Sequence, residues 1–369
     1  MVKEKVGIIS DVHNYFQAYG DAFRRFQDEG IKKVILNGDI CDSQRTLKDS
    51  QEMYARIFSF LSQTGMEVMV QPGSHETYGS YKPVIDHFSS KYSNLIDLLE
   101  TDKVKIGGSD VLFIPGSDWN AGGEFYFQVS DDLETGTYIK TSKGLVPANY
   151  GFYFDLHVNS KDHRDFMDEF KPIEGFLSYK NPKDIIKHVN DSEKTVVVCH
   201  VPRRFDNLET GVDMAHFHEQ RAYHRDFRND FNNFTYTEIS VVPGVIPRKQ
   251  IEAQGIKTFG FGVSDDEILD EAVSLMEKEA QEKVMISVER KANRGNVGLR
   301  DLYSELGITK AVSGHFHESS HRATDNQGNP LVQGEFHNEL FWNSGCLDNS
   351  KYGIITFDEN KISYQNINL

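Results

Sequence analysis

Cysteine is scarce in this sequence, and its scarcity excludes a whole class of small secreted proteins. Only Cys41, Cys199 and Cys346 occur in 369 residues, too few for a disulfide framework, so we expect buried free thiols. No apolar run approaches the roughly 18 residues of a membrane-spanning helix. The short apolar stretch that ends at Ser10 is also too brief for a signal peptide and predicts a first strand instead. These absences predict a cytoplasmic, globular protein.

Positive charge is also in short supply. The chain has 40 lysines and arginines against 56 aspartates and glutamates, a net charge of −16. This balance repels nucleic acid and anionic membranes, so neither is a favoured partner. The sequence does have 38% hydrophobic and 12% aromatic residues, enough to bury a sizeable core.

The first part of the chain alternates strand patterns with helical patterns. Short apolar runs predict strands at 6–9, 34–36 and 68–70. Amphipathic stripes predict a helix after each of these runs, at 16–26, 53–61 and 84–99. This order predicts parallel strands covered by helices.

Two irregular stretches interrupt this rhythm. They lie at about 117–190 and 203–260, are rich in polar and aromatic residues, and enclose a clear apolar strand at 195–199. We interpret residues 1–369 as a single domain in which these two stretches are insertions. The sequence does not indicate an oligomeric state.

Polar side chains follow four of the apolar runs, at the point where each run ends. Because the carboxyl ends of parallel strands meet at one edge of a sheet, we expect these side chains to converge. They are Asp11, His13, Asp39, His200, His315 and His317.

Carboxylates and imidazoles together suit zinc, iron, manganese and related ions. Six candidate ligands exceed what one such ion usually needs, whereas two ions about 3.5–4 Å apart fit the number. Asp39 is the natural bridging carboxylate. Each motif alone is ordinary, because a turn after a strand or a hydrogen-bonded core histidine explains it equally well. The ordered set, with every member at a strand end, favours a dinuclear metal site that hydrolyses a phosphoester.

At this point the sequence resembles the calcineurin-like metallophosphoesterases. The motifs that carry the resemblance are Asp11-x-His13, Gly38-Asp39-x-x-Asp42, Gly73-Ser74-His75-Glu76, His200 and Gly314-His315-x-His317. Asn343-Ser344-Gly345 also lies where the family often has a polar turn. As a set these motifs are specific for the superfamily but indicate little about the substrate.

The resemblance implies an α/β fold, a four-layer α/β/β/α sandwich, and a site for two divalent ions, with manganese, iron or zinc as the candidates. One ion would be held by Asp11, His13, Asp39 and His317, and the other by Asp39, Ser74, His200 and His315. His75 would have the family's catalytic role, donating a proton to the leaving oxygen or stabilising charge on the phosphoryl group, and Asp42 would orient it.

Ser74 departs from the family, which usually has asparagine at this position. A serine hydroxyl is a shorter and weaker neutral ligand than an amide oxygen, so we expect looser binding of the second ion. The catalytic His75 is present, as are the candidate metal ligands other than residue 74, which argues against an inactive site.

The leading interpretation is a phosphodiesterase that hydrolyses its ester with a water activated by two metal ions. The large insertions favour a substrate with a bulky organic group, and Arg203 and Arg204, close after His200, are candidates for binding its phosphate. A phosphomonoesterase and a DNA-repair type of nuclease are the alternative enzymes. A non-catalytic scaffold subunit on the same fold is the alternative of another class.

Overall fold

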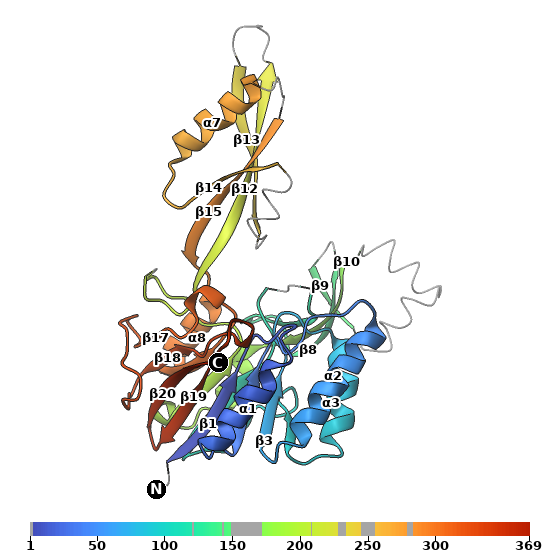
Figure 1. The fold of residues 1–369 in the computed structure, drawn as a ribbon, viewed down its shortest axis with the longest axis vertical. Coiled ribbons are helices and arrows are strands. Elements are labelled where there is room, and N and C mark those ends of the chain that lie inside the picture. The colour runs from blue at the N-terminus through green and yellow to red at the C-terminus, as the bar shows by residue number, and fades with distance from the viewer. Residues whose placement is uncertain are drawn as a thin grey trace. The chain divides into compact units, whose positions relative to one another are not determined.

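A computed structural model describes residues 3–119, 122–141, 144–148, 172–207, 209–227, 234–244, 255–278 and 283–369. The chain forms two compact units (Figure 1). Unit 1 consists of Met1–Asp213 and Arg294–Leu369, and unit 2 of Met214–Asn293. Parts of both expected insertions, 149–171 in the first and 228–233 and 245–254 in the second, lie outside the described residues.

The first sheet of unit 1 has six strands in the order β20-β19-β1-β2-β3-β4. Strands β1 to β4 run parallel to one another. At the β1 edge, β19 pairs antiparallel with β1, and β20 pairs antiparallel with β19. Their bounds are β1 Glu4–Ile9, β2 Lys33–Asn37, β3 Glu67–Gln71, β4 Leu95–Asp97, β19 Lys351–Asp358 and β20 Lys361–Asn368.

The second sheet of unit 1 also has six strands, in the order β17-β18-β16-β11-β6-β5. The four central strands are parallel, and β5 and β17 pair antiparallel at the two edges. Their bounds are β5 Lys103–Ile106, β6 Ser109–Ile114, β11 Thr195–Cys199, β16 Lys310–Ser313, β17 Ala323–Thr324 and β18 Leu340–Asn343.

The two sheets pack face to face and are covered by helices on their outer faces. Val6 and Ile35 of the first sheet share one buried cluster with Val198 and Trp342 of the second. Helices α1 (Ala18–Asp28), α2 (Leu47–Ser62) and α3 (Tyr78–Ser89) contribute to the cluster on the outer face of the first sheet. Helix α8 (Val297–Leu306) does the same on the second. The four-layer α/β/β/α sandwich is thereby confirmed.

One predicted helix was too long. Helix α3 ends at Ser89, and Leu95–Asp97 forms β4, which pairs parallel with β3. The physical reason is a change of period: Leu95 packs in the helix-covered cluster, and the next residue, Ile96, packs against the cluster between the sheets. Alternate burial on two faces is the pattern of a strand, which a short apolar run hides among helical residues.

The remaining elements of unit 1 include a small sheet in the order β7-β10-β8-β9. The strands of this sheet are β7 Phe125–Phe127, β8 Gly136–Thr141, β9 Gly144–Pro147 and β10 Pro172–Lys180. The described residues also form four 3₁₀ helices, η1 Pro182–His188, η2 Ser192–Lys194, η3 His317–Ser319 and η4 Leu347–Asn349. All three cysteines are buried and free, as predicted.

Unit 2 is a four-stranded sheet in the order β13-β12-β15-β14 with a helix packed on it. Its elements are β12 Met214–Phe227, β13 Phe234–Gly244, β14 Lys257–Phe259, α7 Asp265–Lys278 and β15 Lys283–Asn293. Ile268 and Met276 of α7 pack with Val284 and Ile286 of β15 to make its own small core. Among the described residues of both units, no helix is long and apolar enough to cross a membrane.

Candidate metal centre

The candidate ligands lie at the carboxyl ends of parallel strands from both sheets of unit 1. In the first sheet, Asp11 and His13 follow β1, Asp39 follows β2 and Ser74 follows β3. In the second sheet, His200 follows β11, and His315 and His317 follow β16. Since the two sheets pack face to face, their carboxyl edges bring these side chains together, as the pattern of the sequence predicts.

Four of these residues have an unusual backbone conformation. Asp11, His13 and Asp39 have φ angles of 51°, 51° and 52°, and His315 has a φ of 70°. Left-handed backbone is uncommon outside glycine and costs about 1–3 kcal/mol at most such residues. It persists only where the surrounding structure enforces it, and it often marks a functional site. The chain turns sharply here, which aims each side chain at the cluster.

Two glycines let the motif loops approach each other closely. A Cβ atom at Gly73 would lie 2.5 Å from Oδ1 of Asp39, and one at Gly314 would lie 2.5 Å from Oδ2 of Asp11. Any larger residue would push these carboxylates out of place. The glycines of these motifs are therefore explained by close packing around the candidate ligands.

The first ligand group consists of Asp11, His13 and His317. Nε2 of His317 lies 3.5 Å from Oδ1 of Asp11 and 3.4 Å from Nε2 of His13. The other oxygen of Asp11 accepts hydrogen bonds from the Ser10 hydroxyl and from the backbone N–H of His315. These bonds fix the carboxylate so that Oδ1 faces the imidazoles.

The second ligand group consists of Ser74, His200 and His315. Nε2 of His200 lies 3.2 Å from Nδ1 of His315 and 3.1 Å from Oδ2 of Asp39. Nδ1 of His200 donates to the backbone carbonyl of Asn37 at 2.8 Å, which leaves Nε2 to face the cluster. The Ser74 hydroxyl donates to Oδ2 of Asp39 at 2.9 Å.

Asp39 lies between the two ligand groups. Its Oδ1 accepts the backbone N–H groups of Ser74 and His75 at 2.5 Å and 3.0 Å. Its Oδ2 lies close to His200 and, at 4.0 Å, to Nε2 of His75. A carboxylate oriented in this way can reach ions on both sides.

Asp42 connects the candidate catalytic histidine to the first ligand group. Its Oδ1 lies 3.0 Å from Nδ1 of His75 and 2.7 Å from Nδ1 of His13. Each ring donates its Nδ1–H to this oxygen, which turns Nε2 of both toward the cluster. One carboxylate thus orients a candidate ligand and a candidate acid together.

The donor set of the cluster fits divalent metal ions. Two pairs of ring nitrogens approach within 3.2 Å and 3.4 Å, a distance at which their lone pairs repel unless a proton or a cation lies between them. Oδ1 of Asp11 is buried and has no hydrogen-bond partner in the described part of the chain, an arrangement that is costly without a cation nearby. Imidazoles and carboxylates are also the ligands of zinc, iron and manganese.

Protonation of the metal-free cluster follows from burial and opposite charge. Burial lowers the pKa of His200, but Asp39 and Asp11 outweigh it and raise that pKa to about 10. For His13, Asp42 and the other carboxylates outweigh burial and raise the pKa to about 9. Burial and the charge of His200 lower the pKa of His315 to about 4. Despite its burial, Asp39 keeps a pKa well below its ordinary value, because His200 stabilises its charge.

The two arginines predicted to bind substrate have different surroundings. The Arg203 guanidinium lies between the rings of Phe205 and Phe341, 4.1 Å from each centroid, and donates to the carbonyl of Asn326. It is buried, and none of its described contacts is with the candidate ligands. The backbone of Arg204 is held by Asn296, and its role in substrate binding stays a prediction.

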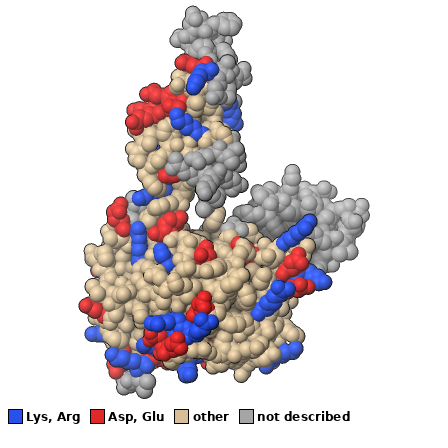
Figure 2. All heavy atoms as spheres, viewed as in Figure 1, with Lys and Arg blue, Asp and Glu red and all other residues tan. Residues whose placement is uncertain are grey.

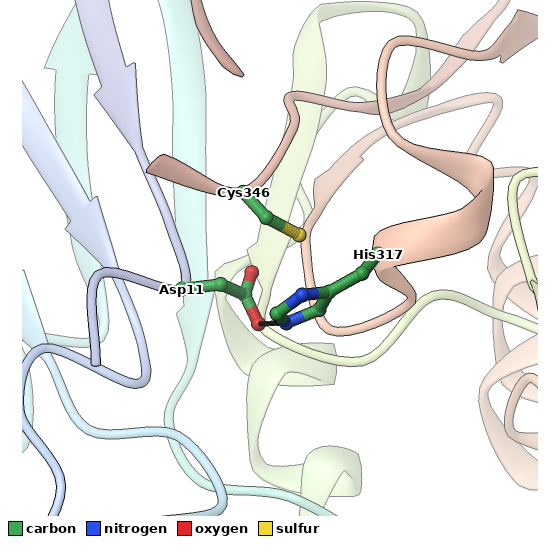
Figure 3. A group of neighbouring side chains, drawn as sticks. All are labelled: Asp11, His317 and Cys346. Atoms are coloured by element: carbon green, nitrogen blue, oxygen red, sulfur yellow. Dashed lines mark ion pairs between the residues drawn. The ribbon is translucent and has the colours of Figure 1, made fainter. Parts of the chain in front are cut away.

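Cys346 and Asp348, which follow β18, also lie at the cluster, although the sequence patterns did not predict them. Figure 3 shows the Cys346 sulfur beside Asp11 and His317. Asp348 has one oxygen 3.4 Å from Nδ1 of His317 and another that is buried with no hydrogen-bond partner among the described residues. Burial, followed by the charge of Asp11, raises the pKa of Cys346 well above its ordinary value, so its thiol stays protonated. The polar turn at 343–345 was the available signal, because it also ends a parallel strand.

The comparisons with known proteins agree with this geometry. The model of the calcineurin-like phosphoesterase family matches residues 4–204, more than half of the chain. The chain belongs to the calcineurin-like phosphoesterase family. Within that family match lie the strands that deliver Asp11, Asp39, Ser74 and His200. The predicted family is thereby confirmed.

Individual relatives are distant. No curated protein matches the chain. The solved structure of TT1561 from Thermus thermophilus is 9% identical, covers 99% of both chains and has a TM-score of 0.45. A structure described as a novel archaeal phosphodiesterase is 15% identical, covers 39% of this chain and 81% of its own, and has a TM-score of 0.23.

Proposed function

We propose that this calcineurin-like phosphoesterase is a phosphodiesterase that depends on two divalent metal ions, with manganese, iron or zinc as the candidates. The observation that carries the proposal is the convergence of histidine nitrogens on two buried carboxylates. The buried Oδ1 of Asp11, which accepts no hydrogen bond from the described residues, lies at its centre. Such a constellation is costly to maintain unless cations use it.

In this proposal the first ligand group and Asp39 hold one ion, and the second ligand group and Asp39 hold the other. When bound, the ions would lower the pKa of a water molecule and polarise a phosphoryl oxygen. Nε2 of His75 faces the cluster and donates a proton to the leaving ester oxygen. Asp42 accepts from Nδ1 of the same ring, which keeps the donating nitrogen directed at the substrate.

The charge of the site favours a diester over a monoester. Among the described residues, every ion pair made by Asp11, Asp39 and Asp42 is with a histidine, and none is with a lysine or arginine. The nearby Arg203 is occupied by two aromatic rings. Both substrates would meet the charge of the two ions. A phosphodiester carries one negative charge and a monoester close to two at neutral pH, so the diester has less need of a further cationic side chain.

The charge of the whole chain weighs against a nuclease. The net charge is −16, and on the face of unit 1 seen in Figure 2 basic side chains lie interspersed with acidic ones. A nuclease needs a basic track along the nucleic-acid backbone. The scaffold alternative has less support, because a scaffold has no reason to keep strained, buried metal ligands.

The test compares bis(4-nitrophenyl) phosphate with 4-nitrophenyl phosphate as substrates. The protein is stripped with chelator, reloaded with Mn²⁺ and assayed beside His75→Ala. We expect metal-dependent cleavage of the diester. We also expect His75→Ala to lower kcat by roughly 10²- to 10⁴-fold, the usual contribution of a general acid, while its metal content is unchanged.

Each other outcome has a defined meaning. Preference for the monoester would replace the proposal with a phosphatase. Equal loss of metal and turnover in His75→Ala would make His75 a ligand and not an acid. Absence of both activity and bound metal would make the scaffold the better interpretation.

A further inference from the structure

The two tryptophans of this protein have opposite environments. Trp342 is fully buried, and its indole N–H donates to Asn366. Trp119 is 53% exposed, although an indole is among the most costly side chains to leave in water. Its ring centroid lies 6.3 Å from that of His315, with the two planes at 63°. An exposed indole therefore adjoins the second ligand group.

The loop that carries Trp119 is firmly anchored. It follows β6, where Gly116 donates to the carbonyl of Pro72 and Ser117 exchanges backbone hydrogen bonds with the β7 region. The backbone N–H of Trp119 donates to the Ser117 hydroxyl. Next to it, Asp118 accepts from the side chain of Asn296, the N-cap of α8, at 2.7 Å. These bonds fix the backbone from which the indole projects before any ligand arrives.

From residue 122 onward the described chain contacts the β3 motif. The backbone N–H of Gly123 donates to the carbonyl of Ser74, and that of Glu124 donates to the carbonyl of Glu76. A Cβ at Gly123 would overlap the Ser74 carbonyl, so the two segments are packed as closely as backbones allow. The position of Trp119 is thus tied to both ligand-bearing edges.

We propose that Trp119 forms a stacking subsite for a planar aromatic ring in the substrate ester, such as a nucleobase. The inference rests on the proposed function, because the ester substituent must lie beside the phosphoryl group at the metal centre. Because the backbone at Trp119 is fixed and an indole has only two side-chain torsions, little conformational freedom is lost when a ring stacks on it. An uncharged planar ring suits this face, since a cation would have to lie beside the ligand imidazoles.

The test uses adenosine 5′-monophosphate and ribose 5-phosphate, which share the phosphate and sugar and differ in the base. Binding to the Mn²⁺-loaded protein is followed by tryptophan fluorescence, because Trp119 is the exposed one of two tryptophans. We expect adenosine 5′-monophosphate to quench the emission and to bind about 5- to 100-fold more tightly than ribose 5-phosphate, the range of one base–aromatic stack.

Variants make this expectation specific. Trp119→Ala should abolish the difference between the two ligands, measured by calorimetry, and Trp119→Phe should keep most of it. Tyr92→Ala removes another exposed aromatic, on the chain after α3, and should leave the difference unchanged. Equal affinities in the unaltered protein, or a difference that survives in Trp119→Ala, would overturn the subsite even where diester hydrolysis proceeds. Failure of both phosphates to bind, with no diester hydrolysis, would instead overturn the proposed function and the subsite with it.

Discussion

The first and second ligand groups differ most in how they meet solvent. In the first, the side chains of His13 and His317 are 16% and 31% exposed, and Asp348 lies behind His317. In the second, His200 is fully buried and Ser74 nearly so, whereas His315 is partly exposed. The first group has charged support and access to water. Two of the three members of the second group are buried, and its neutral member, the Ser74 hydroxyl, donates its proton to Asp39.

This difference indicates that the two ligand groups depend on Asp39 to different degrees for binding their ions. A buried group with a weak neutral ligand depends on the shared carboxylate more than an exposed group with its own aspartate does. We therefore expect the ion of the first ligand group to bind more tightly, and the ion of the second to exchange more readily, although it is the more enclosed.

Asp39→Asn should have the largest effect, because it tests whether the two groups share one bridge. The amide oxygen can still accept the N–H groups of Ser74 and His75, so the loop stays in place, but the bridging charge is lost. We expect loss of both ions and a fall in turnover on the order of 10³-fold or more, since metal pairs supply several kcal/mol of stabilisation.

The measurement is metal content per chain by atomic emission after desalting. Asp358→Asn, which removes a surface carboxylate paired with Lys3, is the matched control and should keep both ions. If Asp39→Asn retained one full equivalent, the two groups would be independent and the comparison would fail.

The pH dependence of metal binding should be the next largest effect. His13 and His200, one from each group, have pKa values raised to about 9 and about 10 in the metal-free protein. Both rings are therefore protonated at pH 7 and must lose a proton to bind an ion. Affinity should rise with pH by up to about tenfold per unit for each proton displaced, and level off above about pH 10.

Calorimetry in buffers of different ionisation enthalpy counts the protons released. Both binding steps should release protons at pH 7, and the release should vanish as the pH rises past the two pKa values. Affinity that falls with pH, or binding without proton release, would show that these imidazoles are neutral in the metal-free protein.

Most of the framework of the site was predictable, because it depends on local order. A strand followed by a polar turn is a short-range signal, and parallel strands guarantee that such turns converge. Asp11, Asp39, His200 and His315 follow from that rule alone. The left-handed backbone at three of them did not, because φ is set by the packing of one loop on another.

Long-range contacts account for what the sequence could not indicate. Arg203 is held by Phe341, and His317 is approached by Asp348, each pair being far apart in the chain. In unit 2, β12 and β15 are the first and last strands along the chain and pair with each other. Local periodicity does not predict which distant strands will pair. Local patterns locate a site at a sheet edge, whereas its outer partners depend on the tertiary fold.

Ser74→Asn should have the smallest effect, and it addresses the asymmetry directly. The Ser74 hydroxyl donates its one proton to Oδ2 of Asp39 at 2.9 Å, and its remaining lone pairs make it a weaker neutral ligand than an amide oxygen. An asparagine would bring a carbonyl oxygen, a better neutral ligand, to the same strand end. We expect the second ion to bind about tenfold more tightly, equivalent to about 1.4 kcal/mol, with the first unchanged.

Titration against a metal-sensitive chelator measures the two affinities separately. Ser74→Ala is the control, because it removes the hydroxyl without supplying a carbonyl oxygen, and it should not tighten the second ion. If Ser74→Asn left the titration unchanged, the weakness of the second ligand group would have another origin. The remaining candidate is then its burial, since placing an ion beside the fully buried His200 carries a desolvation cost that a better ligand at position 74 does not remove.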